Sequence, residues 1–88
     1  MKRDVIFKGS SFTEFNDWQI KNPKVFRKIG ELIEEIRRDP FIGKGKPEPL
    51  KHNLSGYWSR RITDEHRLVY SVNETEVQII SCKYHYSD

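Results

Sequence analysis

The sequence has a single cysteine, Cys82, and no alanine among its 88 residues. One cysteine can neither form an internal disulfide nor supply a thiolate metal cluster, which excludes the usual covalent supports of small secreted domains. No apolar run approaches the roughly 18 residues that cross a bilayer. The start of the chain reaches a charge again at Lys8, too early for a secretory leader. From these absences we expect a soluble, cytoplasmic protein that is held together by packing alone.

The residues that are present suffice for one small domain. Hydrophobic residues make up 35% of the chain and charged residues 33%, and most of the apolar side chains are bulky. A chain of this length buries only about 60 to 65% of its unfolded surface, too little for two separate cores. We therefore expect a single domain over residues 1–88.

The first half of the chain favours helices. Ser11 followed by Glu14 has the spacing of a capping box, which predicts a short helix there. Asn22 and Pro23 provide a cap and a first-turn proline for a second helix, and Pro40 forbids its continuation. The apolar residues of this second segment fall on one stripe of helical period: Val25, Phe26, Ile29, Leu32, Ile33 and Ile36.

The second half favours strands. Segments rich in β-branched and aromatic residues are Val5–Phe7, Tyr57–Ile62, His66–Val72 and Val77–Cys82. Short polar turns at 63–65 and 73–75 predict antiparallel hairpins, whereas Phe41–Ser55 is predicted to be a loop. If the helices cover one face of the sheet, alternation leaves Arg61 and Arg67 free to project from the other face.

Positive charge is concentrated in the middle of the chain. The net charge is +3, and the stretch from Lys44 to Arg67 has three acids (Glu48, Asp64 and Glu65) against six cations: Lys44, Lys46, Lys51, Arg60, Arg61 and Arg67. Because Tyr57 and Trp58 are interleaved with these cations, the stretch is typical of a surface that binds nucleic acid. A solvated charged face is the alternative interpretation.

The residues favour acid–base chemistry over metal chemistry. His52, His66 and His85 lack the close spacing of zinc motifs, so we expect no metal and no cofactor. Cys82 lies late in an apolar strand and is interpreted as a buried hydrophobic residue. Glu48, between two prolines, could accept a proton, and His85 could donate one.

Three segments of the chain resemble one known family. They are GKGKPEPLKHNLSGYWSRRI at 43–62, EHRLVY at 65–70 and YHY at 84–86. In this order they are similar to the YoeB/Txe toxins of the RelE/ParE superfamily. The resemblance implies an α+β, RelE-like microbial RNase fold, in which two N-terminal helices pack on a twisted antiparallel sheet of about four to five strands.

The resemblance also implies an activity and the residues that perform it. The activity is ribosome-dependent cleavage of mRNA by a type II toxin, which inhibits translation without a metal. The implied general base is Glu48, the general acid is His85, and Arg67 binds phosphate and stabilises the transition state. The implied accessory residues are Lys51, Arg61 and Tyr86. We further expect the loop lysines, Lys44 and Lys46, to contact RNA phosphates.

The partners implied by the resemblance are a YefM-like antitoxin, the ribosome and its mRNA, and the oligomeric state stays open between monomer and homodimer. Two alternatives to a nuclease stay open as well. One is a ParE-like inhibitory module that binds a protein target without cutting RNA, and the other is a basic RNA-binding domain. Neither alternative requires Glu48, Arg67 and His85 in combination, so the sequence favours the nuclease.

Overall fold

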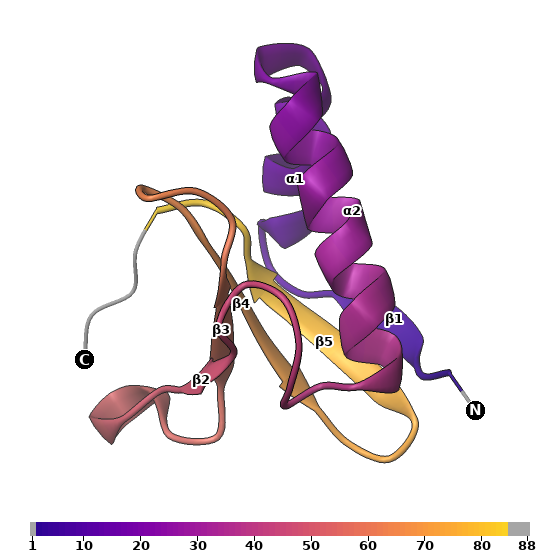
Figure 1. The fold of residues 1–88 in the computed structure, drawn as a ribbon, viewed down its shortest axis with the longest axis vertical. Helices are drawn as coiled ribbons and strands as arrows, with labels where there is room; N and C mark the ends of the chain where they lie inside the picture. Colours follow the sequence, from indigo (N-terminus) through magenta and orange to yellow (C-terminus); the bar gives the residue numbers. More distant parts are fainter. Residues whose placement is uncertain (1, 85–88) are drawn as a thin grey trace.

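A computed structural model describes residues 2–84 (Figure 1). The elements in chain order are β1 (Asp4–Phe7), α1 (Ser11–Lys21), α2 (Pro23–Arg38), β2 (Glu48–Pro49), the 3-10 helix η1 (His52–Leu54), β3 (Trp58–Arg61), β4 (Arg67–Val72) and β5 (Glu76–Ser81). The five strands form one sheet, and α1 and α2 lie side by side against one face of it. This arrangement confirms the predicted α+β class with two N-terminal helices. No helix among these residues is long and apolar enough to span a membrane.

The sheet is antiparallel except at one edge. The strand order is β1-β5-β4-β3-β2, and the hairpins predicted for β3, β4 and β5 are present. β1 differs from the antiparallel expectation because it runs parallel to β5, with Val5 beside Val77. The two strands are separated in the chain by both helices and the other strands, so no tight turn imposes antiparallel pairing on them.

The longer helix, α2, is set by its cap and its apolar stripe. The side chain of Asn22 accepts a hydrogen bond from Val25 N at 3.4 Å, and Pro23 occupies the first turn. Five of the six stripe residues are buried: Val25, Ile29, Leu32, Ile33 and Ile36. They share one core cluster with sheet residues that include Leu68, Tyr70, Val77 and Ile79. The helix ends at Arg38, before Pro40, as predicted.

The predicted capping box at the start of α1 is wrong. Ser11 is the first residue of the helix and is buried, and its hydroxyl donates to the carbonyl oxygen of Ile79 at 2.9 Å. Glu14 does not complete a capping box either: its Oε2 accepts a hydrogen bond from the hydroxyl of Ser10 at 3.2 Å, and its Oε1 accepts one from Cys82 N at 2.9 Å. Both side chains therefore tie α1 to β5 and the residue after it, a tertiary use that local spacing does not reveal.

The segment predicted as a loop between Phe41 and Ser55 contains two short elements, β2 and η1. β2 pairs Glu48 with Ser59 and Pro49 with Trp58 at the outer edge of the sheet. A proline is tolerated there because an edge strand has one side without a pairing partner. The pairing fixes Glu48 to the edge of the sheet.

Candidate active site

A pocket of about 240 Å³ lies where β2, β3 and the start of β4 meet. Its lining residues are Gly45, Lys46, Glu48, Leu50, Ser59, Arg61 and Arg67. Cations outnumber the single carboxylate of the lining, so the pocket favours an anionic ligand. The structure thus brings together Lys46, Glu48, Arg61 and Arg67 from the residues predicted by the sequence.

Strand pairing places the pocket residues on one face of the sheet. Glu48 lies opposite Ser59, and Arg61, two residues further along β3, lies opposite Arg67. Directly opposed residues, and residues two apart on a strand, point to the same side. The other side of β4 carries Leu68, which belongs to the core. The prediction that Arg61 and Arg67 project from the face away from the helices is therefore confirmed.

The two arginines of the pocket are held differently. Arg67 is half-buried, and its Nη1 donates to the carbonyl oxygens of Thr63 at 2.6 Å, His66 at 3.0 Å and Asp64 at 3.2 Å. These acceptors belong to the β3–β4 hairpin, which fixes the direction of the Arg67 side chain. Arg61 is exposed, so its guanidinium has room to adjust to a ligand.

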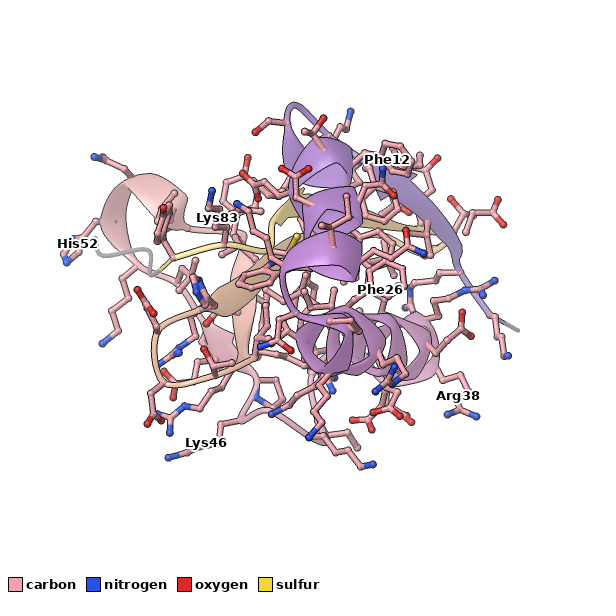
Figure 2. The ribbon with its side chains drawn as sticks, turned by 90° about the horizontal axis from the view of Figure 1, so that it is seen from above. Phe12, Phe26, Arg38, Lys46, His52 and Lys83 are labelled. Atoms are coloured by element: carbon pink, nitrogen blue, oxygen red, sulfur yellow. The ribbon has the colours of Figure 1, made fainter. Side chains whose placement is uncertain are left out.

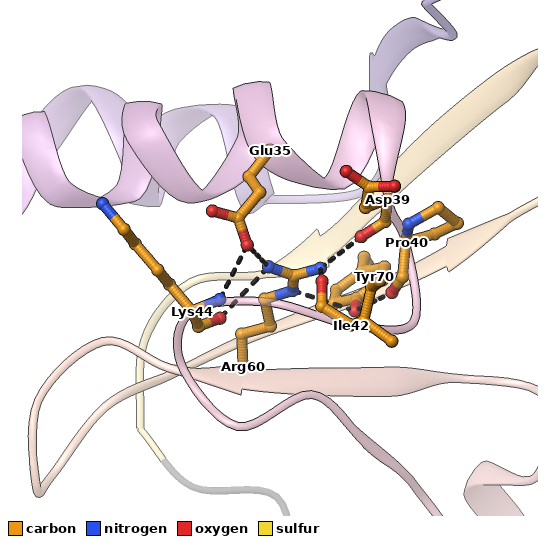
Figure 3. Close-up of polar contacts among 7 residues, drawn as sticks. All are labelled: Glu35, Asp39, Pro40, Ile42, Lys44, Arg60 and Tyr70. Carbon is orange, nitrogen blue, oxygen red and sulfur yellow. Dashed lines mark hydrogen bonds and ion pairs between the residues drawn. The ribbon is translucent and has the colours of Figure 1, made fainter.

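Arg60 is not part of the basic surface, contrary to the prediction. It is fully buried, and it donates hydrogen bonds to Glu35 Oε1, the hydroxyl of Tyr70 and three backbone carbonyls, those of Asp39, Ile42 and Lys44 (Figure 3). The bond to Glu35 is an ion pair of 2.6 Å. Alternation along the chain explains the difference, because Arg60 lies on the same side as buried Ile62 and opposite to Arg61.

The Arg60 cluster shapes the loop that leads into the pocket. Glu35 Oε1 also accepts a hydrogen bond from Lys44 N at 2.7 Å, and this bond, assisted by Arg60, holds the pKa of Glu35 below its ordinary value. Gly43 is required in this loop, because its φ is +118° and an added Cβ would lie 1.8 Å from Glu35 Oε1. At the end of the loop, Gly45 accepts a hydrogen bond from Arg61 N at 2.6 Å. The loop is thereby joined to the strand that carries Arg61.

Two predicted lysines lie outside the pocket lining. Lys44 lines a separate groove of about 460 Å³ beside α2, together with Lys24, Arg27, Lys28, Glu31 and Leu32. Lys51 directly precedes η1 and is exposed. Lys46, in contrast, lines the pocket, and its side chain extends outward from the loop (Figure 2). The contacts of Lys44, Lys46 and Lys51 with RNA stay predictions.

His85 and Tyr86, the predicted general acid and an accessory residue, lie outside the described residues, which end at Tyr84. The carbonyl oxygen of Tyr84 accepts a hydrogen bond from Arg67 N at 3.1 Å. The last described residue is therefore bonded to the backbone of a pocket residue.

Thiol chemistry at Cys82 is disfavoured by its surroundings. The side chain is fully buried, and its Sγ lies 3.8 Å from the carbonyl oxygen of Ser11. Burial raises the pKa of the thiol to about 12, so Cys82 is protonated at neutral pH. This confirms its interpretation as a buried apolar residue. Within residues 2–84 no group of three or more His, Cys, Asp or Glu side chains is arranged to hold a metal ion.

Sequence reasoning missed part of the pocket lining. Ser59 precedes Arg61 by two residues, so the alternation that placed Arg61 on the open face could also have found Ser59. Gly45 and Leu50 line the pocket through the course of the loop and of β2, for which the sequence carries no comparable signal.

Comparison with known proteins agrees with the fold and with the motif. Residues 7–86 match the family model of the YoeB-like toxins of bacterial type II toxin–antitoxin systems. Toxin YoeB of Escherichia coli K12 is 55% identical over 82 residues, which cover 93% of this chain and 98% of that protein.

Solved structures support the same relationship. The YoeB dimer from Staphylococcus aureus has a TM-score of 0.89 at 45% identity, and the YoeB–YefM complex from the same organism has a TM-score of 0.86 at 46% identity. In both comparisons 98% of this chain and 100% of the other are covered. The predicted RelE-like fold is confirmed, and the chain belongs to the family of YoeB-like toxins of bacterial type II toxin–antitoxin systems.

Proposed function

We propose that this chain is a ribosome-dependent mRNA endoribonuclease that inhibits translation by metal-free acid–base cleavage. The proposal combines its membership of the toxin family with the chemistry of the pocket. The substrate in this proposal is ribosome-bound mRNA. It must be RNA, because the proposed reaction uses the 2′-hydroxyl of the substrate as its nucleophile.

The observation that carries the proposal is the pairing of two arginines beside a carboxylate. Arg61 and Arg67 are direct cross-strand partners, and like charges in this position destabilise a sheet. Glu48 lines the same pocket from β2. A phosphodiester placed between the arginines would relieve their repulsion, and its ribose would be within the reach of a base on the neighbouring strand.

The proposed steps assign one role to each residue. Glu48 accepts the proton of the 2′-hydroxyl, and the resulting oxygen attacks the adjacent phosphorus. Arg67, held by its hairpin, stabilises the charge that develops on the pentavalent phosphate, with Lys51 assisting. The bond to the 5′-oxygen breaks, and His85 protonates that leaving oxygen. The products are a 2′,3′-cyclic phosphate and a 5′-hydroxyl.

The remaining pocket cations and Tyr86 serve binding in this proposal. Arg61 contacts the reacting phosphodiester opposite Arg67, and Lys46 contacts a neighbouring phosphate. Tyr86 contacts the substrate near His85, and Lys44 contributes from its neighbouring groove. We also propose a YefM-like antitoxin as the partner that inhibits the toxin, since a relative has been solved with YefM, and a homodimer, since a relative has been solved as one.

Substitution of the proposed base and acid tests the reaction. Glu48→Gln and His85→Gln each keep a polar side chain of similar size, and each should lower single-turnover cleavage on programmed ribosomes by about 10²-fold or more. Affinity for the ribosome should change little, because neither variant removes a lysine or arginine that is proposed to contact phosphate. Glu74→Gln is the matched control, since it makes the same chemical change in the exposed β4–β5 turn.

The result also discriminates between the nuclease and a blocking module. If Glu48→Gln and His85→Gln inhibit translation as strongly as the wild type while the mRNA stays intact in all cases, the protein acts by occupying its target and the endoribonuclease proposal is wrong.

A further inference from the structure

The backbone that follows β5 is hydrogen-bonded to side chains of α1 through both its N–H and its carbonyl group. Cys82 N donates to Glu14 Oε1 at 2.9 Å, and the carbonyl oxygen of Cys82 accepts a hydrogen bond from Trp18 Nε1 at 3.0 Å. Both backbone groups of Cys82 are thus occupied by helix side chains. The chain leaves the sheet in a fixed direction, toward the β3–β4 hairpin.

Two residues further on, Tyr84 is held in the same way by the hairpin. Its N–H donates to His66 Nδ1 at 2.8 Å, and its carbonyl oxygen accepts a hydrogen bond from Arg67 N at 3.1 Å. The φ of Tyr84 is +63°, a conformation that non-glycine residues seldom adopt without support from their surroundings. The two hydrogen bonds supply that support.

His66 is well placed to act as the acceptor in this contact. Its ring packs edge-on against the Trp18 ring, with 4.8 Å between the two ring centroids, and its side chain is 12% exposed. Nε2 faces Glu65 Oε1 at 3.7 Å. Because Nδ1 accepts the hydrogen bond from Tyr84, the neutral ring carries its proton on Nε2. The carboxylate beside Nε2 favours this tautomer.

We propose that His66 is a positioning residue of the cleavage reaction, which sets the place of the segment bearing the general acid. This inference rests on the proposed function. His85 follows Tyr84 directly in the sequence, and adjacent Cα atoms are about 3.8 Å apart. The position of the Tyr84 backbone therefore limits the positions that are open to the next residue. Arg67, the other partner of Tyr84, is the residue proposed to stabilise the reacting phosphate. The hydrogen bond from Tyr84 to His66 therefore links the placement of the acid to the pocket.

A pair of substitutions separates this role from general packing. His66→Asn can retain an acceptor near the position of Nδ1, whereas His66→Leu removes the acceptor and keeps an apolar side chain against Trp18. We expect His66→Leu to lower the single-turnover cleavage rate by about 10-fold or more, because small misplacements of a catalytic group are costly. Ribosome affinity should change less than about twofold. His66→Asn should recover most of the rate, and His52→Asn, at an exposed histidine of η1, should leave it unchanged.

Amide hydrogen exchange gives a readout that does not depend on cleavage. In the full-length chain labelled with ¹⁵N at its four tyrosines, the Tyr84 amide should be protected in the wild type and in His66→Asn and should exchange faster in His66→Leu. The Tyr70 amide, in the core strand β4, reports whether the fold is intact in each variant.

The outcomes distinguish failure of the inference from failure of the proposed function. Wild-type cleavage by His66→Leu, or equally slow cleavage by both His66 variants with Tyr70 still protected, would overturn the positioning role. Unchanged Tyr84 exchange in His66→Leu would overturn it as well, whether or not any RNA is cut. A wild-type chain that cuts no RNA would overturn the proposed function, and with it the positioning role of His66 in cleavage. The exchange data would still decide whether His66 holds Tyr84.

Discussion

Arg60 is fully buried, and a buried guanidinium is destabilising unless its donors are occupied. Here they are occupied by one carboxylate, one hydroxyl and three backbone carbonyls. The carbonyls belong to the loop that follows α2, and the arginine supplies hydrogen bonds that water would otherwise make. Removing one partner of such a pair typically costs about 3 to 5 kcal/mol. The charge therefore stabilises the loop beside the pocket and is not exposed at the surface.

The acid dependence of stability should reveal this cluster. Because the pKa of Glu35 is held below its ordinary value of 4.5, its contribution to stability is fully present above that value and is lost as the pH falls through the lower folded-state pKa. Glu35→Gln removes the charge but keeps an oxygen acceptor, so it should cost less than loss of the whole partner. We expect it to reduce the free energy of unfolding at neutral pH by roughly 1 to 3 kcal/mol, the usual worth of a hydrogen bond to a charged group. The difference from the wild type should narrow as the solution is acidified, as measured by urea unfolding across the acid range.

Glu34→Gln is the matched control for Glu35→Gln. Glu34 is the preceding residue, its side chain is 54% exposed, and hydrogen bonding and charge from Arg37 also hold its pKa below the ordinary value. Salt should screen the effect of Glu34→Gln, because its ion pairs lie at the surface. If the effect of Glu35→Gln disappeared equally in high salt, the Arg60–Glu35 pair would be acting as a surface ion pair and our account of the cluster would be wrong.

At the scale of elements, local signals predicted the helices and hairpins well. α2 was predictable because a cap, a stripe and a terminating proline all agree over its length. The parallel pairing of β1 with β5 was not predictable, since it joins Asp4–Phe7 to a strand near the other end of the chain. The capping box failed for a related reason, because Ser11 is used in a contact with Ile79 rather than in a local one.

A single substitution in α2 should stabilise the folded protein. Gly30 lies inside α2, and a Cβ added there would meet nothing within 4 Å. Glycine in a helix interior is less favourable than alanine because it loses more backbone entropy on folding. We expect Gly30→Ala to raise the free energy of unfolding by about 0.5 to 1 kcal/mol, measured by chemical denaturation.

Gly9→Ala is the control that isolates the backbone conformation. A Cβ at Gly9 would also meet nothing within 4 Å, but Gly9 has a φ of +55° in the connection between β1 and α1. The same substitution should therefore destabilise the protein by about 1 kcal/mol at this position. Equal changes in the free energy of unfolding for Gly30→Ala and Gly9→Ala would show that the backbone conformation of the glycine does not determine the effect.

At the scale of the whole molecule, the sequence predicted which residues form the pocket better than it predicted the surface as a whole. Arg61 and Arg67 meet because strand alternation and hairpin order follow from local patterns. Glu48 joins them through β2, in a segment that the sequence predicted as a loop. The count of positive charges was less informative, since it placed Arg60 on the surface although the core contains it. Net charge says nothing about which cations share a surface, and only the packed fold decides that.

The location of positive charge should matter more for ribosome binding than its total. Lys46→Ala and Lys2→Ala each remove one positive charge, but from different places. Lys46 lines the pocket, whereas Lys2 Nζ forms an ion pair of 3.5 Å with Oε1 of Glu34 on α2. Each phosphate contact steepens the dependence of affinity on salt, so Lys46→Ala should weaken binding and reduce the slope of log K against log salt by about 1. Lys2→Ala should leave that slope near the wild-type value. Binding to programmed ribosomes over a salt series, under conditions that block cleavage, measures both. Equal losses of slope for the two variants would mean that the net field of the molecule, and not the pocket, attracts the RNA.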